Sequence, residues 1–113
     1  MTNNLNPHSC SDTLFFDVNE TLLDTTELNQ VVAQRLGDRP ERAEAWFTSV
    51  LHHSLVESVT GSWHSFGDIA ETVLKMTASR YGVTLPEEAT PLADIIAAMP
   101  PHPDVAAGLT ALQ

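Results

Sequence analysis

The chain has few basic residues, a single cysteine and no long apolar run. Five Lys and Arg residues stand against fifteen Asp and Glu residues, which leaves a formal net charge of -10. Such an acidic surface repels the phosphates of nucleic acids, so no nucleic-acid partner is expected. No stretch approaches the roughly 18 consecutive apolar residues that cross a bilayer, so no membrane partner is expected either.

The single cysteine, Cys10, has no second cysteine with which to form an internal disulfide. A free thiol is tolerated in the reducing cytosol, and the first residues lack both the basic segment and the apolar core of a secretory signal. The sequence therefore predicts a cytoplasmic protein. With 113 residues, of which 42% are apolar and 18% charged, it predicts at most one globular domain with a modest core.

What the chain has in quantity is helical periodicity after residue 25. Apolar residues spaced three and four apart predict helices at about 25–36, 40–60, 65–81, 91–98 and 104–113. Gly61 and Gly82 are suited to end the second and third of these helices. Ser65, together with Asp68, and Thr90 are the predicted N-caps of the third and fourth helices.

Residues 13–17 have a different pattern. They are mostly apolar on both faces, which is typical of a strand buried in a parallel sheet. A buried strand needs neighbours, because each unpaired buried backbone group costs roughly 1–3 kcal/mol. The rest of the sequence is helical, so we expect the other strands to lie beyond Gln113 and the chain to be incomplete.

Asp17 ends this predicted strand and is followed at once by a polar turn. Open α/β folds bind their ligands at the carboxyl edge of the sheet, where such a carboxylate would lie. An Asp at this place can also serve the turn alone, by accepting hydrogen bonds from backbone N–H groups. The pattern by itself leaves both roles open.

The stretch "FFDVNETLLD" resembles the first motif of the haloacid dehalogenase superfamily, in which a hydrophobic residue and then Asp-x-x-x-Thr-Leu stand at a strand end. "WFTSVLHHSLVESVTGSWHSF" and "MPPHPDV" are similar to the type II haloacid dehalogenase group. The resemblance runs from about Thr13 to the last residue. In the motif a glycine often stands where this chain has Glu20, so a small difference in the geometry of the turn is expected.

The resemblance implies an α/β fold, with a Rossmann-like core and an inserted all-helical cap. This chain would hold only the first strand and a return helix of that core, so it would itself be mostly α. The implied parts are a flexible N-terminal tail at 1–12, the first core strand and nucleophile loop at 13–24, the helical cap at 25–99 and an incomplete return to the core at 100–113.

The activity implied by the resemblance is covalent catalysis by Asp17. Asp17 would displace halide from a 2-haloacid, and water would cleave the resulting ester to give a 2-hydroxy acid. Superfamily phosphatases carry a second Asp two positions on, where this chain has Asn19, which exchanges no proton near neutral pH. Halide leaves without protonation, so Asn19 favours dehalogenation over phosphatase activity. No metal or other cofactor is expected, since the second carboxylate of a Mg²⁺ site is absent.

The resemblance also implies where a halogenated organic acid binds. The positions assigned to it are Asn19, Thr21, Phe47, Thr48, Leu51 and Phe66. Phe47 falls where the type II group has an arginine that grips the substrate carboxylate, a contact that phenylalanine does not make. Thr48, Leu51 and Phe66 fit the core of the cap as well as they fit a pocket, so both interpretations are open.

The alternative to an enzyme is a non-catalytic helical module that forms a homodimer through the cap helices. In that case Asp17 has no catalytic role. The remaining motifs of the family would lie past Gln113, and catalytic groups act as a unit, so we expect little turnover from this chain alone. His53 and Glu57 have the spacing of a helical metal pair but no convincing third ligand, and a solvated helix face is predicted there, as it is for Glu44.

Overall fold

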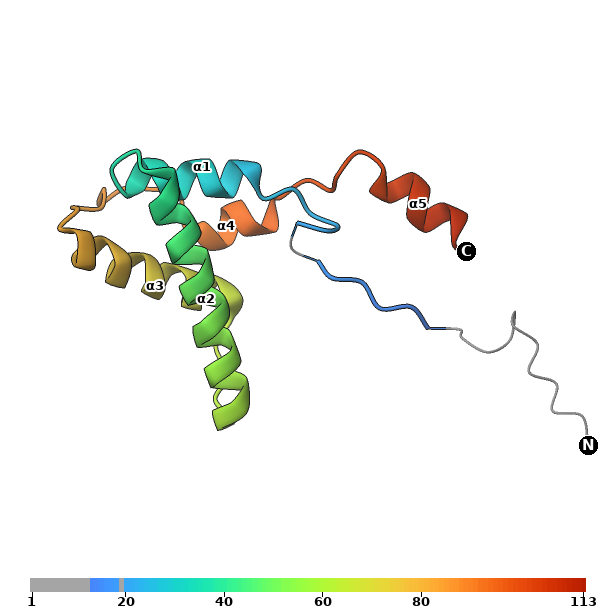
Figure 1. The fold of residues 1–113 in the computed structure, drawn as a ribbon, viewed down its shortest axis with the longest axis horizontal. Coiled ribbons are helices and arrows are strands. Elements are labelled where there is room, and N and C mark those ends of the chain that lie inside the picture. Colours follow the sequence, from blue (N-terminus) through green and yellow to red (C-terminus); the bar gives the residue numbers. More distant parts are fainter. Residues whose placement is uncertain (1–12, 19) are drawn as a thin grey trace, which may run out of the picture.

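The computed structural model of the chain describes residues 13–18 and 20–113 (Figure 1). Within these residues the regular secondary structure is helical, apart from one isolated bridge between Leu23 and Pro101. The helices are α1 (Thr26–Arg35), α2 (Pro40–Thr60), α3 (Phe66–Tyr81), α4 (Leu92–Ala97) and α5 (Val105–Ala111). The prediction of a mostly α chain is therefore confirmed. The predicted tail at 1–12, which includes Cys10, lies outside the described residues.

Helices α1 to α4 pack into one unit, here called the helical body (residues 26–99). Helix α2 packs against α1 and α3, and α4 packs against α3 and α1. Trp46 is fully buried at the centre, and its Nε1–H donates a hydrogen bond of 3.1 Å to the Ala70 carbonyl on α3. The buried apolar residues are Leu28, Val32, Leu36, Ala43, Trp46, Val50, Ala70, Val73, Leu74, Ala78, Leu92 and Met99. Among the described residues, no helix is both long and apolar enough to cross a membrane.

The two predicted helix caps have different outcomes. Ser65 caps α3 as predicted, since its hydroxyl accepts a 3.1 Å hydrogen bond from the Asp68 N–H. The prediction for Thr90 is wrong, because α4 has no side-chain cap of its own. Instead the Leu92 N–H donates to the carboxylate of Glu71, which reaches across from α3. A partner that is distant in the sequence has replaced the local cap.

Residues 13–17, where a strand was predicted, form no strand among the described residues. Residues 13–18, here called the arm, are extended and exposed but belong to no strand. Phe15 is 93% exposed although it is one of the most apolar residues in the segment. An extended segment becomes a strand only when its backbone pairs with a neighbour, and the described residues contain no sheet for the arm to join.

The chain enters and leaves the helical body through two adjacent segments. Residues 22–24 lie antiparallel to residues 100–102, and the Asp24 N–H donates a 2.8 Å hydrogen bond to the Pro100 carbonyl. Figure 1 shows the arm and α5 extending away from the body beyond this pairing, and α5 has no buried residue. A unit whose two ends lie side by side can be inserted into another domain with little distortion.

Candidate functional site

Asp17 lies where the arm meets a tight turn. The Val18 carbonyl accepts hydrogen bonds from the N–H groups of Leu22 (2.9 Å) and Leu23 (3.0 Å), which bend the chain back toward the helical body. The Thr21 hydroxyl donates a 3.2 Å hydrogen bond to Oδ2 of Asp17. The structure thus brings together two residues that the sequence predicted for the site, and both are exposed.

Glu20 occupies the strained position of this turn. Its φ of 65° lies in the left-handed region, where the resembling motif often has glycine and where other residues pay roughly 1–2 kcal/mol. The Glu20 N–H donates to the Leu23 carbonyl (3.0 Å), and the Glu20 carbonyl accepts from Nε2 of His102 (2.9 Å). The side-chain Oε1 accepts from the Thr25 hydroxyl at 3.3 Å. Hydrogen bonds to its backbone and to its side chain therefore hold Glu20 in this conformation.

A second pair of Asp and Thr side chains follows at the start of α1. Oδ1 of Asp24 accepts hydrogen bonds from the Thr26 hydroxyl at 2.6 Å and from the Thr26 N–H at 2.9 Å. These two hydrogen bonds lower the pKa of Asp24 below its ordinary value of 3.8, and the bond from the Thr26 hydroxyl has the larger effect. The pair links the turn to the start of the helical body.

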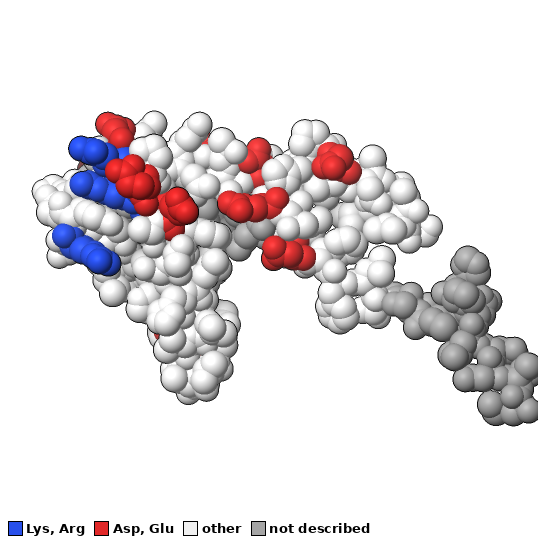
Figure 2. All heavy atoms as spheres, viewed as in Figure 1, with Lys and Arg blue, Asp and Glu red and all other residues white. Residues whose placement is uncertain are grey.

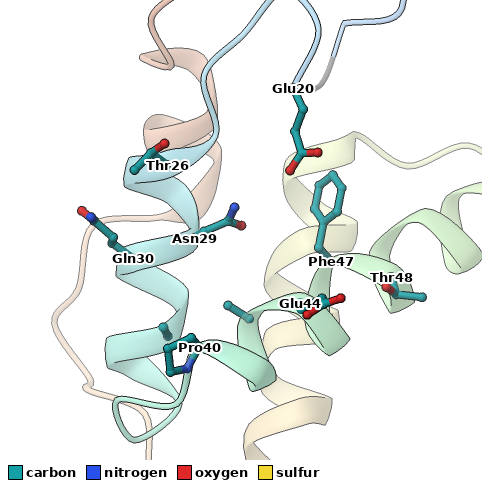
Figure 3. A pocket seen from close by; sticks show the side chains of 10 residues that line it. Glu20, Thr26, Asn29, Gln30, Pro40, Glu44, Phe47 and Thr48 are labelled. Carbon is teal, nitrogen blue, oxygen red and sulfur yellow. The ribbon is translucent and has the colours of Figure 1, made fainter.

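A groove of about 610 Å³ opens beside this turn, between α1 and the first half of α2 (Figure 3). Its volume falls within the range of about 300–1,000 Å³ that is usual for small-molecule sites. The polar lining residues are Glu20, Thr26, Asn29, Gln30, Glu44 and Thr48. The apolar lining residues are Ala33, Pro40, Ala43 and Phe47.

The groove contains two of the predicted substrate-binding residues. Phe47 and Thr48 line it, and Figure 3 shows the Phe47 ring rising from α2 toward the Glu20 carboxylate. Leu51 does not line the groove and is 46% exposed further along α2. Phe66 lies at the start of α3, where it lines a separate pocket of about 240 Å³. The sequence alone did not distinguish the residues that line the groove from Leu51 and Phe66, which do not.

Asp17 and Thr21 do not line the groove, although Glu20 in the same turn does. Asp17, the predicted nucleophile, therefore does not line the groove that holds Phe47 and Thr48. Glu20, in the same turn as Asp17, is the residue that connects the two places. Asn19, the remaining predicted site residue, lies outside the described residues.

The polar side of the groove was missed by reasoning from sequence. The side-chain amide of Asn29 donates to the Thr25 hydroxyl at 3.3 Å, and that hydroxyl in turn donates to Glu20. Thr25 is only 6% exposed, so this chain of hydrogen bonds passes through the edge of the core. Glu44, predicted on a solvated face, is exposed as expected and also lines the groove. Its spacing of three and four residues from Phe47 and Thr48 was the signal that the three side chains share a surface.

The groove has no basic residue in its lining. All five Lys and Arg residues of the chain fall at described positions, and those near the groove are engaged elsewhere. Arg35 donates to the Thr90 carbonyl at 2.7 Å, while Arg42 donates to the Leu36 carbonyl at 2.8 Å and lies over the Tyr81 ring. Figure 2 shows the basic side chains gathered at one end of the molecule and the acidic ones spread along the same face.

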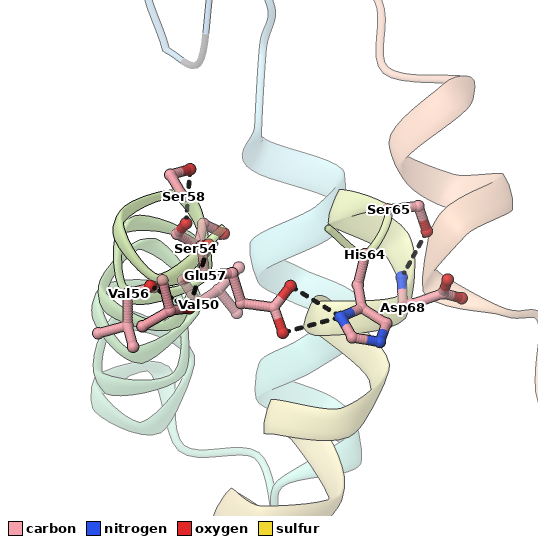
Figure 4. Close-up of polar contacts among 9 residues, drawn as sticks. Val50, Ser54, Val56, Glu57, Ser58, His64, Ser65 and Asp68 are labelled. Atoms are coloured by element: carbon pink, nitrogen blue, oxygen red, sulfur yellow. Dashed lines mark hydrogen bonds and ion pairs between the residues drawn. The ribbon is translucent and has the colours of Figure 1, made fainter. Parts of the chain in front are cut away.

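His64, in the loop between α2 and α3, forms a contact separate from the groove. Nδ1 of His64 lies 2.8 Å from both carboxylate oxygens of Glu57, which ties the loop before α3 to the end of α2 (Figure 4). Nowhere in residues 13–18 and 20–113 are three or more His, Cys, Asp or Glu side chains placed to hold a metal ion. This contact therefore joins two elements of the body and offers no metal centre.

Comparison with protein-family models and with curated proteins gives no match for this chain. The chemistry open to the site is that of the turn and the groove themselves. A carboxylate held by a hydroxyl beside a groove can attack a carbon atom of a bound molecule, or it can serve the turn alone.

Proposed function

We propose that the chain carries the nucleophile loop and the helical cap of a haloacid dehalogenase-like hydrolase, in which Asp17 displaces halide from an organic halide. The turn after Asp17 is the observation that carries this proposal. The Thr21 hydroxyl donates a hydrogen bond to the Asp17 carboxylate, and Glu20, which stands where the resembling motif often has glycine, has a left-handed backbone. Both features support a turn that holds the Asp17 carboxylate in a defined position.

The layout of the chain supports the same proposal. The chain enters and leaves the helical body through two paired segments, as it would in a cap inserted into another domain. The arm is extended and apolar on both faces, which suits a strand in the interior of a sheet. The proposal therefore includes an α/β core with a Rossmann-like sheet, which the arm joins and which the described residues do not themselves form.

The reaction proceeds in two steps. A carboxylate oxygen of Asp17 attacks the carbon that bears the halogen, halide departs with the bonding electron pair, and an ester forms on Asp17. Water then attacks the carbonyl of this ester and releases an alcohol. Among the described residues no base contacts Asp17, since its partner there is the Thr21 hydroxyl. We therefore expect this chain to perform the first step slowly and the second poorly.

Halide release from 2-chloropropionate by the purified chain tests the proposal. We expect no sustained turnover and at most about one halide per chain, because the ester is not hydrolysed efficiently. Asp17→Asn should abolish this release. Asp24→Asn is the matched control, because Asp24 is also an Asp held by a Thr hydroxyl. Release that is unchanged in Asp17→Asn would contradict the proposal.

The lining of the groove is poorly suited to a 2-haloacid, the substrate that the resemblance implies. The carboxylate of such a substrate would meet Glu20 and Glu44, and no basic residue lines the groove. Phe47 makes no ionic contact in place of the expected arginine. A 2-haloacid would therefore need a basic residue from outside the groove to hold its carboxylate.

A second candidate function is supported by the outer face of α2. The buried residues of α2 are Ala43, Trp46 and Val50, all in its first half. The second half carries a set of exposed apolar side chains, here called the α2 stripe: Leu51, Leu55, Val56 and Val59. At about 100° per residue, these side chains lie on the side of the helix opposite to the buried ones. Such a face is typical of protein contact surfaces, so a homodimer through α2 is the alternative to an enzyme.

Sedimentation velocity over a range of concentrations tests this second candidate. If α2 forms a homodimer, Leu55→Asp should shift the chain to monomer, because it places a charge in the middle of the stripe. Met76→Asp is the control, because Met76 is an exposed apolar residue on α3. A chain that stays monomeric at every concentration would contradict the homodimer.

A further inference from the structure

The groove between α1 and α2 has the charge and the groups of a site for an organic cation. Two carboxylates, Glu20 and Glu44, and one aromatic ring, Phe47, line it without any basic side chain. We propose that it binds a small alkylammonium compound, with the ammonium group at the carboxylates and the Phe47 ring and the alkyl part against the apolar wall.

Glu20 is held in place for this role before any ligand arrives. Its Oε1 accepts from the Thr25 hydroxyl, which itself accepts from the side-chain amide of Asn29. Thr25 is buried, so these two hydrogen bonds fix the direction of the Glu20 side chain. In Figure 3 the Glu20 carboxylate points from the loop toward the Phe47 ring. One oxygen of the carboxylate remains for an N–H donor.

Glu44 supplies the second carboxylate from α2. Its side chain makes no ion pair or hydrogen bond with any described residue, so a bound ammonium group displaces no existing partner. Glu44 precedes Phe47 by three residues and Thr48 by four, which places the three side chains on one face of the helix. An ammonium group between Glu44 and the ring gains both ionic attraction and a cation–π contact.

The apolar wall suits the alkyl part of the same ligand. Ala33 from α1 and Pro40 and Ala43 from α2 line the groove. These side chains offer no hydrogen bond to a polar tail, whereas they pack well against methylene groups. An organic acid of the same size would place its charge near two carboxylates in a chain of net charge -10. The groove therefore discriminates by charge.

The binding of an alkylammonium compound stands apart from the reaction at Asp17. Only the further step, that the ammonium group is the handle of the substrate, rests on the proposed hydrolase. Asp17→Asn should accordingly leave the affinity of the groove unchanged, because Asp17 does not line it. Failure of the halide test and failure of the binding test are thus distinguishable.

Titration of the full chain with n-butylammonium, followed by backbone amide NMR, tests the inference. We expect saturable shifts at the amides of Asn29, Gln30, Glu44 and Phe47, with a dissociation constant on the order of 1 mM for so small a molecule. Butyrate has the same alkyl part and the opposite charge, and it should bind at least about tenfold more weakly. Equal affinity for butyrate, or no saturable shift with butylammonium, would overturn the inference.

Single substitutions locate the charge that matters. Glu44→Gln should weaken butylammonium binding by about threefold to fivefold, the usual size of one exposed ionic contact. Glu41→Gln is the matched control, because it removes the same charge from the first turn of α2, outside the groove. Equal losses in the two variants would mean that only the overall charge attracts the cation, and the site would be refuted. Phe47→Leu should weaken binding by a factor of about two to five if the ring contributes.

Discussion

The helical body and the arm are both rich in apolar residues, yet only the body buries them. Trp46, Leu28 and Leu74 are at most 2% exposed, whereas Phe15 in the arm is 93% exposed. A helix satisfies its own backbone, so four helices can assemble from one stretch of chain. An extended segment depends on another strand for its hydrogen bonds. The pattern of apolar residues thus indicates which side chains would be buried. Whether they are buried depends on the elements that are present to pack or pair with them.

The largest contrast is expected between the two most different aromatic residues. Trp46→Ala removes a fully buried ring and its hydrogen bond to Ala70, so the free energy of unfolding should fall by about 3–5 kcal/mol. Phe15→Ala should change it by less than about 0.5 kcal/mol. Urea unfolding followed by circular dichroism measures both. A comparable loss in Phe15→Ala would show that the arm is packed in solution.

Adding one methyl group at Gly67 in the helical body or at Gly108 in α5 tests how closely each region is packed. A Cβ at Gly67 would lie 2.7 Å from Cβ and 3.2 Å from Cα of Ala93, where α3 and α4 meet. Gly67→Ala should therefore lower the free energy of unfolding by about 1–3 kcal/mol. Gly108 in α5 has nothing within 4 Å of such an atom, so Gly108→Ala should raise helicity without a steric cost. Thermal unfolding monitored by circular dichroism should show a lower transition temperature for Gly67→Ala and not for Gly108→Ala, and equal changes would contradict the close approach of α3 and α4.

The two helix caps give a smaller effect. Ser65→Ala removes the hydroxyl that accepts from Asp68, so it should cost about 1 kcal/mol. Thr90→Ala should cost almost nothing, because Glu71 serves the start of α4 instead. Urea unfolding of both variants is the measurement. A loss in Thr90→Ala as large as that in Ser65→Ala would restore Thr90 as the cap.

The smallest effect is expected at the junction between the two regions. Hydrogen bonds from Thr26 lower the pKa of Asp24, so the ionised carboxylate stabilises the fold above its unfolded pKa of 3.8. This contribution is lost as the pH falls through the lower folded pKa. Thr26→Ala should raise the pKa of Asp24 toward 3.8 in an NMR titration, while Thr21→Ala should leave it unchanged. No rise in Thr26→Ala would mean that the Asp24–Thr26 contact is not formed in solution.

The parts of the fold that could be predicted from the sequence are those fixed by nearby residues. Apolar residues spaced three and four apart predicted the helices, and the proximity of Ser65 to Asp68 predicted a cap. What failed depended on residues far away in the chain. Glu71 serves α4 from 21 positions before Leu92, and no local pattern announces it.

The candidate site divides in the same way. The contact between Thr21 and Asp17 spans only four residues, and both residues were assigned to the site from the sequence. The groove depends on a turn, α1 and α2 coming together, so the roles of Glu20 and Asn29 in it required the structure. Leu51 and Phe66 show the converse, because their helical positions fitted the core of the cap as well as a pocket, and neither residue lines the groove.

Peptide mapping by mass spectrometry tests most directly whether Asp17 is a nucleophile. After incubation of the chain with 2-chloropropionate, the account predicts a mass increase on the peptide that contains Asp17, separate from any thiol adduct at Cys10. The increase should be absent in Asp17→Asn and retained in Asp24→Asn. An unmodified Asp17, or equal modification of Asp17 and Asp24, would contradict the assignment of Asp17 as the nucleophile.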